Sequence, residues 1–164
     1  MLVKKICMIG DFAVGKTSLV ARFVHTVFSD KYLTTVGVKI DTKALTLEDA
    51  RQCKLILWDI AGSSALTTVE RSYLKGAAGY LLVVDGTRRS TLDAARQLHA
   101  QVRETMGELP FQVLINKADL SEQWEIGDDD IKELERAGWP VTRSSAKSGA
   151  GVEDSFKALA ACVA

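Results

Sequence analysis

The fold of this chain is decided by the stretch Gly10-Asp11-Phe12-Ala13-Val14-Gly15-Lys16-Thr17. It fits the pattern G-x-x-x-x-G-K-[S/T], in which a glycine-rich loop connects a strand to a helix. Both neighbours are of the required kind, because residues 3–9 are apolar and rich in β-branched side chains, and residues 16–23 place apolar side chains on one helical face. The stretch therefore predicts a phosphate-binding loop after the first strand of an α/β fold.

Each part of this loop suits an anion. Gly10 and Gly15 let the backbone approach a phosphate closely, and the loop N–H groups present positive potential together with the N-terminus of the next helix. The Lys16 ammonium can reach β- and γ-phosphate oxygens, and the Thr17 hydroxyl can ligate Mg²⁺. The expected phosphate contacts are Asp11, Phe12, Ala13, Val14, Gly15, Lys16, Thr17 and Ser18. The loop alone indicates a nucleoside triphosphate without saying which one.

Outside the loop, strand-like and helical stretches alternate. The patterns predict strands at residues 3–9, 38–47, 51–59, 80–85, 111–115 and 140–143, and helices at residues 16–23, 91–106, 128–137 and 152–163. Residues 27–37 and 60–69 have no clear period and are expected to be irregular. We expect one α/β domain over residues 1–164, with a six-stranded, mostly parallel sheet, one antiparallel hairpin strand and about five helices on both faces.

Composition limits the functions that remain. The 164 residues carry 21 Lys and Arg against 21 Asp and Glu, so the net charge is zero and strong attraction to nucleic acid is not expected. No apolar run approaches the ~20 residues of a membrane span, and neither end matches a lipidation motif. We therefore expect a cytoplasmic protein with no membrane anchor in this sequence; a lipidated tail beyond it would add peripheral membrane association.

A carboxylate and a glycine follow the third expected strand, in Trp58-Asp59-Ile60-Ala61-Gly62. An Asp at a strand end beside a phosphate loop can hold Mg²⁺, often through water. The Gly62 N–H can bond the γ-phosphate. An Asp-x-x-Gly alone is usually only a turn, but its position downstream of a phosphate loop favours the metal-binding interpretation.

The loop Asn116-Lys117-Ala118-Asp119, after the fifth expected strand, suits a guanine base. The Asp119 carboxylate can accept from the adjacent N1–H and 2-amino donors of guanine, which adenine lacks. Asn116 can tie this loop to the phosphate loop, and the Lys117 stem can cover one face of the ring. A P-loop kinase or ATPase would instead require Asp119 to tolerate adenine.

The loop Ser145-Ala146-Lys147 follows the sixth expected strand and suits the same base. The Ala146 N–H can donate to the guanine O6, and Lys147 can help to wall the ring. Each of these short motifs is unspecific alone. Their order, each at a strand end, indicates a guanine-nucleotide site.

With these motifs in order, the chain resembles the small GTPases of the Ras superfamily over its whole length, and the Rab branch most closely. Three further stretches look Rab-like: Tyr32-Leu33-Thr34-Thr35-Val36-Gly37, Lys54-Leu55-Ile56-Leu57-Trp58-Asp59-Ile60-Ala61-Gly62 and Arg71-Ser72-Tyr73-Leu74-Lys75-Gly76-Ala77-Ala78-Gly79. The resemblance implies a P-loop G domain that binds GTP and GDP with Mg²⁺ as cofactor and acts as a molecular switch.

The same resemblance implies roles for residues that periodicity does not mark. Thr35 would complete the coordination of Mg²⁺, Phe28 would meet the base edge-on, and Tyr32 would cover the γ-phosphate. The implied partners are an effector protein that contacts residues 28–40 and 60–75, an exchange factor and a GTPase-activating protein. Lys16, Thr35, Gly62 and Ser63 are the candidate catalytic residues.

Two residues depart from the family pattern. The family places Gln after the Asp-x-x-Gly glycine, where it orients the attacking water, but here the position is Ser63. Serine is too short to reach the place of the glutamine amide, so we predict slow intrinsic GTP hydrolysis. Phe12 replaces a small residue beside the γ-phosphate. Its ring either obstructs an activator's arginine, which is worth about 10³–10⁵ in rate, or packs outward.

The departures leave two functions open. The first is a switch that turns over GTP slowly. The second is a hydrolysis-deficient, mostly GTP-loaded domain that acts as a binding scaffold.

Overall fold

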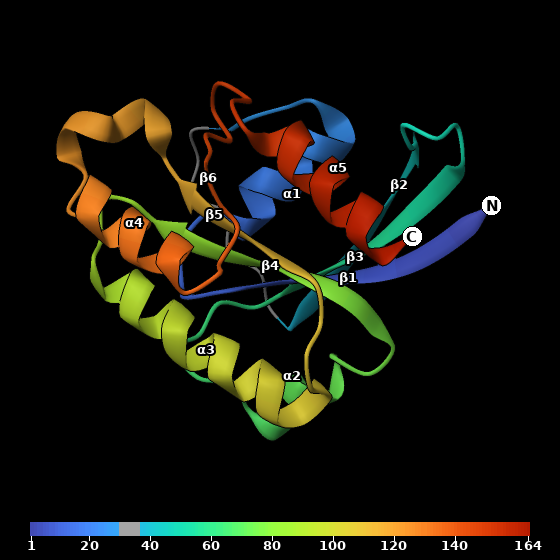
Figure 1. Ribbon diagram of the computed structural model, residues 1–164, viewed down its shortest axis with the longest axis horizontal. Coiled ribbons are helices and arrows are strands. Elements are labelled where there is room, and N and C mark those ends of the chain that lie inside the picture. The colour runs from blue at the N-terminus through green and yellow to red at the C-terminus, as the bar shows by residue number, and fades with distance from the viewer. Residues whose placement is uncertain (30–36) are drawn as a thin grey trace.

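A six-stranded sheet covered by helices on both faces forms the centre of the molecule (Figure 1). The computed structural model describes residues 1–29 and 37–164. The strands are β1 (Leu2–Gly10), β2 (Val38–Thr46), β3 (Gln52–Ile60), β4 (Ala77–Asp85), β5 (Phe111–Asn116) and β6 (Val141–Arg143), in the spatial order β2-β3-β1-β4-β5-β6. Among the strand pairs of these described residues, only β2–β3 is antiparallel. The fold class expected from the sequence is therefore confirmed.

The helices connect these strands and bury them. They are α1 (Lys16–His25), α2 (Thr68–Ser72), α3 (Ser90–Met106), α4 (Asp128–Arg136) and α5 (Val152–Val163), with a short 3₁₀ helix, η1 (Ala118–Gln123). Figure 1 shows α1 and α5 above the sheet and α3 below it. No helix of the described residues is long and apolar enough to cross a membrane.

The alternation of side chains along the central strands produces two cores. In β1, Ile6 and Met8 face α1 and α5, where Phe23 and Phe156 stack with ring centroids 4.0 Å apart. Cys7 and Ile9 face the second core, which includes apolar residues of α3 and α4. Strands buried on both faces read as continuous apolar runs, which is why β1 and β4 were visible in the sequence.

The carboxyl ends of the parallel strands β1, β4 and β5 meet at one edge of the sheet. Gly10 pairs with Val83, and Asp85 pairs with Asn116, so the ends of the three strands lie level. In Figure 1 this edge is remote from both chain termini. Loops at the carboxyl ends of strands are where open α/β sheets bind ligands.

The helix α2 was not expected, because residues 60–69 show no apolar period. A capping box starts it: the Thr67 hydroxyl accepts from the Glu70 N–H at 3.1 Å, and the Glu70 carboxylate accepts from the Thr67 N–H at 3.0 Å. The Thr-x-x-Glu spacing was the available signal. A five-residue helix with no buried residue has no apolar stripe for a periodicity analysis to detect.

Candidate functional site

The phosphate loop carries Lys16 folded back over its own backbone. The ammonium donates to the carbonyls of Gly10 and Asp11, both at 3.1 Å, and the residue is only 5% exposed. Burial lowers the pKa of Lys16 to about 8, although the carboxylates of Asp59, Asp11 and Glu70 oppose the shift. An anion bound in the loop would favour the charged ammonium.

Thr17 and Asp59 come together from different elements. Thr17 lies in the first turn of α1 and donates its hydroxyl to the Asp59 carboxylate at the end of β3, at 2.6 Å. Asp59 is 1% exposed. Mg²⁺ takes oxygen ligands, usually one or two from protein side chains with the rest from phosphates and water. A hydroxyl and a buried carboxylate beside a phosphate loop are a donor set that fits Mg²⁺.

The segment around Gly62 packs directly on the phosphate loop. A Cβ at Gly62 would lie 2.7 Å from Phe12 Cα and 2.8 Å from the Asp11 carbonyl oxygen, so only glycine permits this approach. The Ser63 N–H donates to the Gly10 carbonyl at 3.3 Å. The expected closeness of this segment to the phosphate loop is therefore present.

The Ser63 side chain has partners within its own segment. Its hydroxyl donates to the Ala65 carbonyl at 2.8 Å and lies 3.5 Å from a Glu70 carboxylate oxygen. Glu70 reaches it because the capping box turns α2 back toward this segment. Sequence analysis did not connect these two residues, which are seven positions apart.

The two expected base loops contact each other and the phosphate loop. The Asn116 amide donates to the Val14 carbonyl at 3.0 Å, the link expected of Asn116, and its oxygen accepts from Ser144 at 3.3 Å. The Ser145 hydroxyl donates to the Asp119 carboxylate at 2.7 Å, which fixes one oxygen of that side chain. A fixed carboxylate at this place can accept from two adjacent donors of a base.

Arg22 of α1 holds the backbone of the loop at residues 145–147. Its guanidinium donates to the Ala146 carbonyl at 2.8 Å and also to the Lys147 carbonyl. Ala146 is buried and Lys147 is exposed at the rim. Sequence analysis did not identify Arg22, because no sequence motif connects an arginine of α1 with a loop more than 120 residues later.

Asp85 and Arg88 are the other site residues that the sequence reasoning missed. Asp85 ends β4 and is fully buried, with Lys117 Nζ at 2.7 Å and Arg88 Nε at 3.0 Å. Burial raises the pKa of Asp85, but hydrogen bonds from Lys117, Thr87 and Arg88 together hold it below its ordinary value. A carboxylate at the carboxyl end of a buried strand was the available signal.

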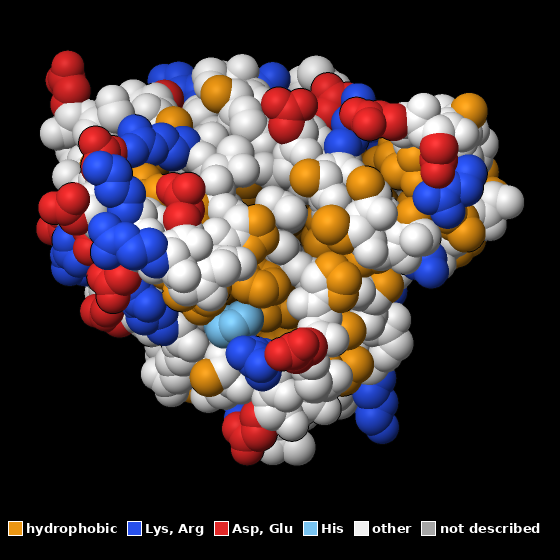
Figure 2. Space-filling view, viewed as in Figure 1, with side chains coloured by type: hydrophobic (Ala, Val, Ile, Leu, Met, Phe, Trp, Pro, Cys, Tyr) orange, Lys and Arg blue, Asp and Glu red, His pale blue; other side chains and the backbone are white. Residues whose placement is uncertain are grey.

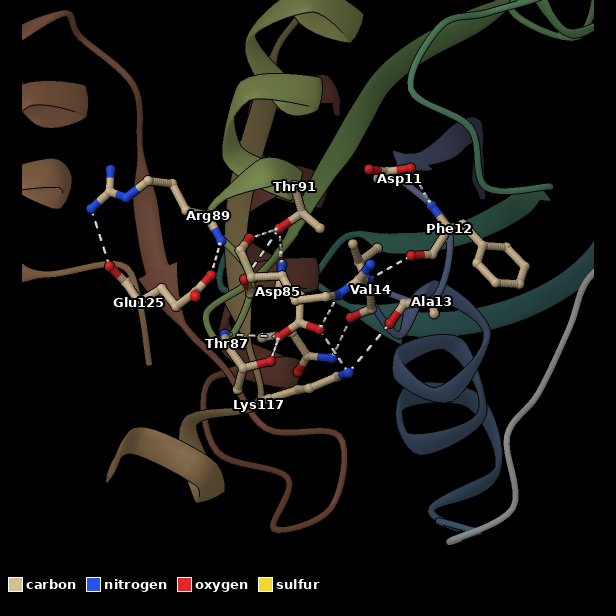
Figure 3. Close-up of polar contacts among 12 residues, drawn as sticks. Asp11, Phe12, Ala13, Val14, Asp85, Thr87, Arg89, Thr91, Lys117 and Glu125 are labelled. Atoms are coloured by element: carbon tan, nitrogen blue, oxygen red, sulfur yellow. Dashed lines mark hydrogen bonds and ion pairs between the residues drawn. The ribbon is translucent and has the colours of Figure 1, made fainter. Parts of the chain in front are cut away.

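Other expected site residues have exposed side chains or lie in α1. The Phe12 ring is 50% exposed and points away from the polar cluster in Figure 3, and Phe28 is 38% exposed. Ser18 lies in the first turn of α1. Tyr32 and Thr35 lie outside the described residues.

A hollow lies away from these loops, toward the amino ends of β4 and β5. Figure 2 shows hydrophobic side chains around a histidine on this face. A cavity of about 250 Å³ is lined by aromatic residues, among them Phe111 and Trp139, and by His99, whose Nδ1 lies 2.6 Å from the Tyr80 hydroxyl. It is separate from the candidate site.

Known proteins resemble this chain over most of its length. The sequence profile of the Ras family matches residues 5–164. The Ras-related protein RABA4b of Arabidopsis thaliana is 36% identical over 157 residues, which cover 94% of this chain and 70% of the relative. The GTP-binding protein ypt2 of Schizosaccharomyces pombe is 34% identical over 159 residues, covering 95% and 78%. The Ras-related protein Rab-7L1 of Rattus norvegicus is 35% identical over 164 residues, covering 94% and 79%.

The fold and the order of its loops define a phosphate-loop α/β protein. With the family match and these relatives, the chain belongs to the Ras family of small GTPases, on its Rab branch.

Proposed function

We propose that this domain binds GTP and GDP with Mg²⁺, hydrolyses GTP slowly and signals through the loops around its γ-phosphate site. The observation that carries the proposal is the joining of the base loop to the phosphate loop. Asp119 is oriented by Ser145, and the neighbouring Asn116 donates to Val14 of the phosphate loop. A ligand that fills both places has a guanine base and a phosphate chain.

The base preference follows from the donors of guanine. N1–H and the 2-amino group lie side by side, and the Asp119 carboxylate accepts from both. Adenine would present an acceptor to the same carboxylate and leave it unpaired, which costs roughly 1–3 kcal/mol or more. The site therefore rejects adenine nucleotides.

Hydrolysis is in-line attack of water on the γ-phosphate. Lys16 and the loop N–H groups stabilise the charge that spreads over the phosphate oxygens in the transition state. Mg²⁺ held by Thr17 and Asp59, with Thr35 as the expected third protein ligand, supplies further charge neutralisation when bound.

The slow rate is assigned to Ser63. Its hydroxyl donates to Ala65 within its own segment, and its side chain is too short to replace the glutamine amide of the family pattern. The water therefore lacks its usual orienting group. An activating protein would have to supply that group. The half-exposed Phe12 ring of the phosphate loop would either obstruct it or turn outward.

Switching follows from the contact between Gly62 and the phosphate loop. The γ-phosphate would hold the Gly62 N–H and Thr35, and its loss would release both segments. An effector would then distinguish the two states through residues 28–40 and 60–75, and exchange and activating proteins would act on the same surface. A cytoplasmic location is part of this proposal.

A scaffold that stays loaded with GTP is the second candidate. The engaged Ser63 hydroxyl favours it, because a site without a water-orienting group retains its triphosphate. The nucleotide that co-purifies separates the two. We expect guanine nucleotide with a substantial GTP fraction after denaturation and ion-pair chromatography. GDP alone would overturn the slow rate, and adenine nucleotide would overturn the base assignment.

Base recognition has its own test in Asp119→Asn, with Asp129→Asn as the matched control on the exposed face of α4. The amide presents a donor where guanine also presents one. We expect GDP affinity to fall on the order of a hundredfold, with a gain for the xanthine nucleotide, whose 2-carbonyl accepts. Equal GDP affinity in both variants, measured by calorimetry, would refute the role of Asp119.

A further inference from the structure

Three consecutive carbonyls of the phosphate loop are held from the outside by side chains of other elements. The Phe12 carbonyl accepts from Arg88 Nη2 at 2.6 Å. The Ala13 carbonyl accepts from Lys117 Nζ at 3.3 Å, and the Val14 carbonyl accepts from Asn116 Nδ2 at 3.0 Å. Each anchor lies at or just after the carboxyl end of β4 or β5.

The anchors set the direction of the loop N–H groups. In a planar trans peptide the C=O and the next N–H point in opposite directions. Holding the three carbonyls outward therefore turns the N–H groups of Ala13, Val14 and Gly15 inward, where successive N–H groups form a concave anion site. The N–H groups of the loop thus line an anion site, and the carbonyls on its outer side are held by hydrogen bonds from other elements.

The first of these peptides needs the support most. Ala13 has φ +61°, in the left-handed region that is unfavourable for a residue with a Cβ. Such a conformation persists only where the surroundings hold it. Arg88 holds the peptide before Ala13, and Lys117 holds the one after it.

One buried carboxylate orients both cations. Asp85 is 0% exposed and lies 2.7 Å from Lys117 Nζ and 3.0 Å from Arg88 Nε. Its other oxygen accepts from the hydroxyl and the N–H of Thr87. Figure 3 shows Asp85 and Lys117 together beside the phosphate loop, with a contact from Lys117 to Ala13. The Arg88 guanidinium spans from Asp85 to the phosphate loop with different nitrogens.

We propose that Arg88 and Asp85 are positioning residues that aim the Ala13 N–H at the nucleotide phosphates beyond the α-phosphate. The inference rests on the proposed function and deepens it, because it assigns part of the phosphate affinity to two side chains that contact no ligand. Asn116 and Lys117 belong to the base loop. Asp85 and Arg88 instead connect the end of β4 and the segment before α3 to the phosphate loop.

The proposal predicts a selective loss. Removing the Arg88 anchor frees the Phe12–Ala13 peptide and leaves the base loop bonded through Asn116 and Ser145. Affinity for GDP should therefore fall, and affinity for GMP, which lacks the β-phosphate, should not. A role limited to the start of α3 would loosen the whole site and weaken both ligands alike.

The test is Arg88→Ala against Arg89→Ala. Arg89 is the matched control, because its guanidinium pairs with Asp130 and Glu125 away from the phosphate loop. With Mg²⁺ present, we expect Arg88→Ala to raise the Kd for GDP on the order of tenfold, with the Kd for GMP within about twofold of the parent. Arg89→Ala should match the parent for both ligands.

Two further variants support the comparison. Arg88→Lys keeps a cation that can reach one of the two partners, so it should recover part of the GDP affinity. Asp85→Asn keeps the volume and removes the charge that orients Lys117 and Arg88, so it should lower the GDP affinity at least as much as Arg88→Ala does. If Asp85→Asn does not fold, as judged by its thermal unfolding, the Arg88 pair decides the question.

Each outcome has one meaning. An unchanged Kd for GDP in Arg88→Ala, or equal losses for GDP and GMP, overturns the positioning role while the proposed function stands. A parent protein that binds no GDP overturns the proposed function, and this inference with it.

Discussion

Adding one methyl group at Gly86 tests how the base loop is supported. Gly86 follows β4 and is buried, and the Trp124 indole lies flat against it. A Cβ at Gly86 would lie 2.1 Å from Trp124 Cε2 and 2.5 Å from Trp124 Nε1. Gly86 has no positive φ, so alanine meets only this steric conflict.

Hydrogen bonds restrict the movement of the Trp124 indole away from Gly86. Its Nε1 donates to the Lys117 carbonyl at 2.8 Å, and the next residues, Glu125 and Ile126, donate their N–H groups to the Gly86 carbonyl at 2.9 and 3.3 Å. Glu125 and Ile126 are thus hydrogen-bonded to Gly86, the same residue whose added methyl group would clash with the Trp124 ring. Movement of the ring must break the Lys117 bond or strain the backbone.

The expected cost combines two effects. Overpacking of this kind costs about 1–3 kcal/mol, and loss of the Trp124–Lys117 hydrogen bond adds about 1 kcal/mol. The free energy of unfolding of Gly86→Ala should therefore fall by about 2–4 kcal/mol, and the Tm by roughly 5–12 °C for a domain of this size. Thermal unfolding at one fixed GDP concentration measures the shift.

The double variant Gly86→Ala/Trp124→Ala is the control. Without the indole, the added methyl has room, so Gly86→Ala should change the Tm little in a Trp124→Ala background. The cycle should yield a coupling of about 2 kcal/mol. A Tm within about 1 °C of the parent for the single variant, or equal effects in both backgrounds, would refute this reasoning.

Three other predictions concern Ser63, Gly62 and the hollow beside His99. Ser63→Gln should raise the rate of single-turnover GTP hydrolysis roughly tenfold or more by restoring a group that orients water. Phosphate release measures this rate. An unchanged rate would count against Ser63 as the cause of slow hydrolysis. Gly62→Ala should force its segment off Phe12 Cα, 2.7 Å from the new Cβ, and reduce the preference for GTP over GDP about tenfold, as seen in the two dissociation rates. Burial, and then the charge of Arg103, hold the pKa of His99 below its ordinary value of 6.5. The folded state therefore takes up this proton less readily than the unfolded chain, so the free energy of unfolding should drop as pH falls through about 6.5. His99→Gln should flatten that dependence in urea titrations, and an unaltered slope would exclude His99 as its source.

The elements that could be predicted from the sequence were those marked by short runs of consecutive residues. The apolar runs at β1, β4 and β5 predicted strands, and the antiparallel hairpin of β2 and β3 was expected. The limits of the elements shifted by a few residues; β4, for example, begins at Ala77 because its first residues pair with β1. Pairing with a neighbouring strand is a nonlocal property.

The candidate site divides in the same way. The phosphate loop could be identified because a strand end, two glycines, a lysine and a helix start follow one another without interruption. The base loops could be identified because the chemistry of guanine fixes a short order of polar residues. The ligand roles of all these residues stay predictions.

The sequence by itself therefore determined the α/β class, the phosphate loop and the position of the base loops. Only the tertiary structure decided what holds these loops: Asp85 and Arg88 behind Phe12, Arg22 beneath Ala146, and Trp124 against Gly86. The reason is physical. The residues that define each loop type follow one another in the chain, so the loop can be identified from sequence alone. A buried charge or a packed ring finds its partner only when strands far apart in the chain are brought side by side.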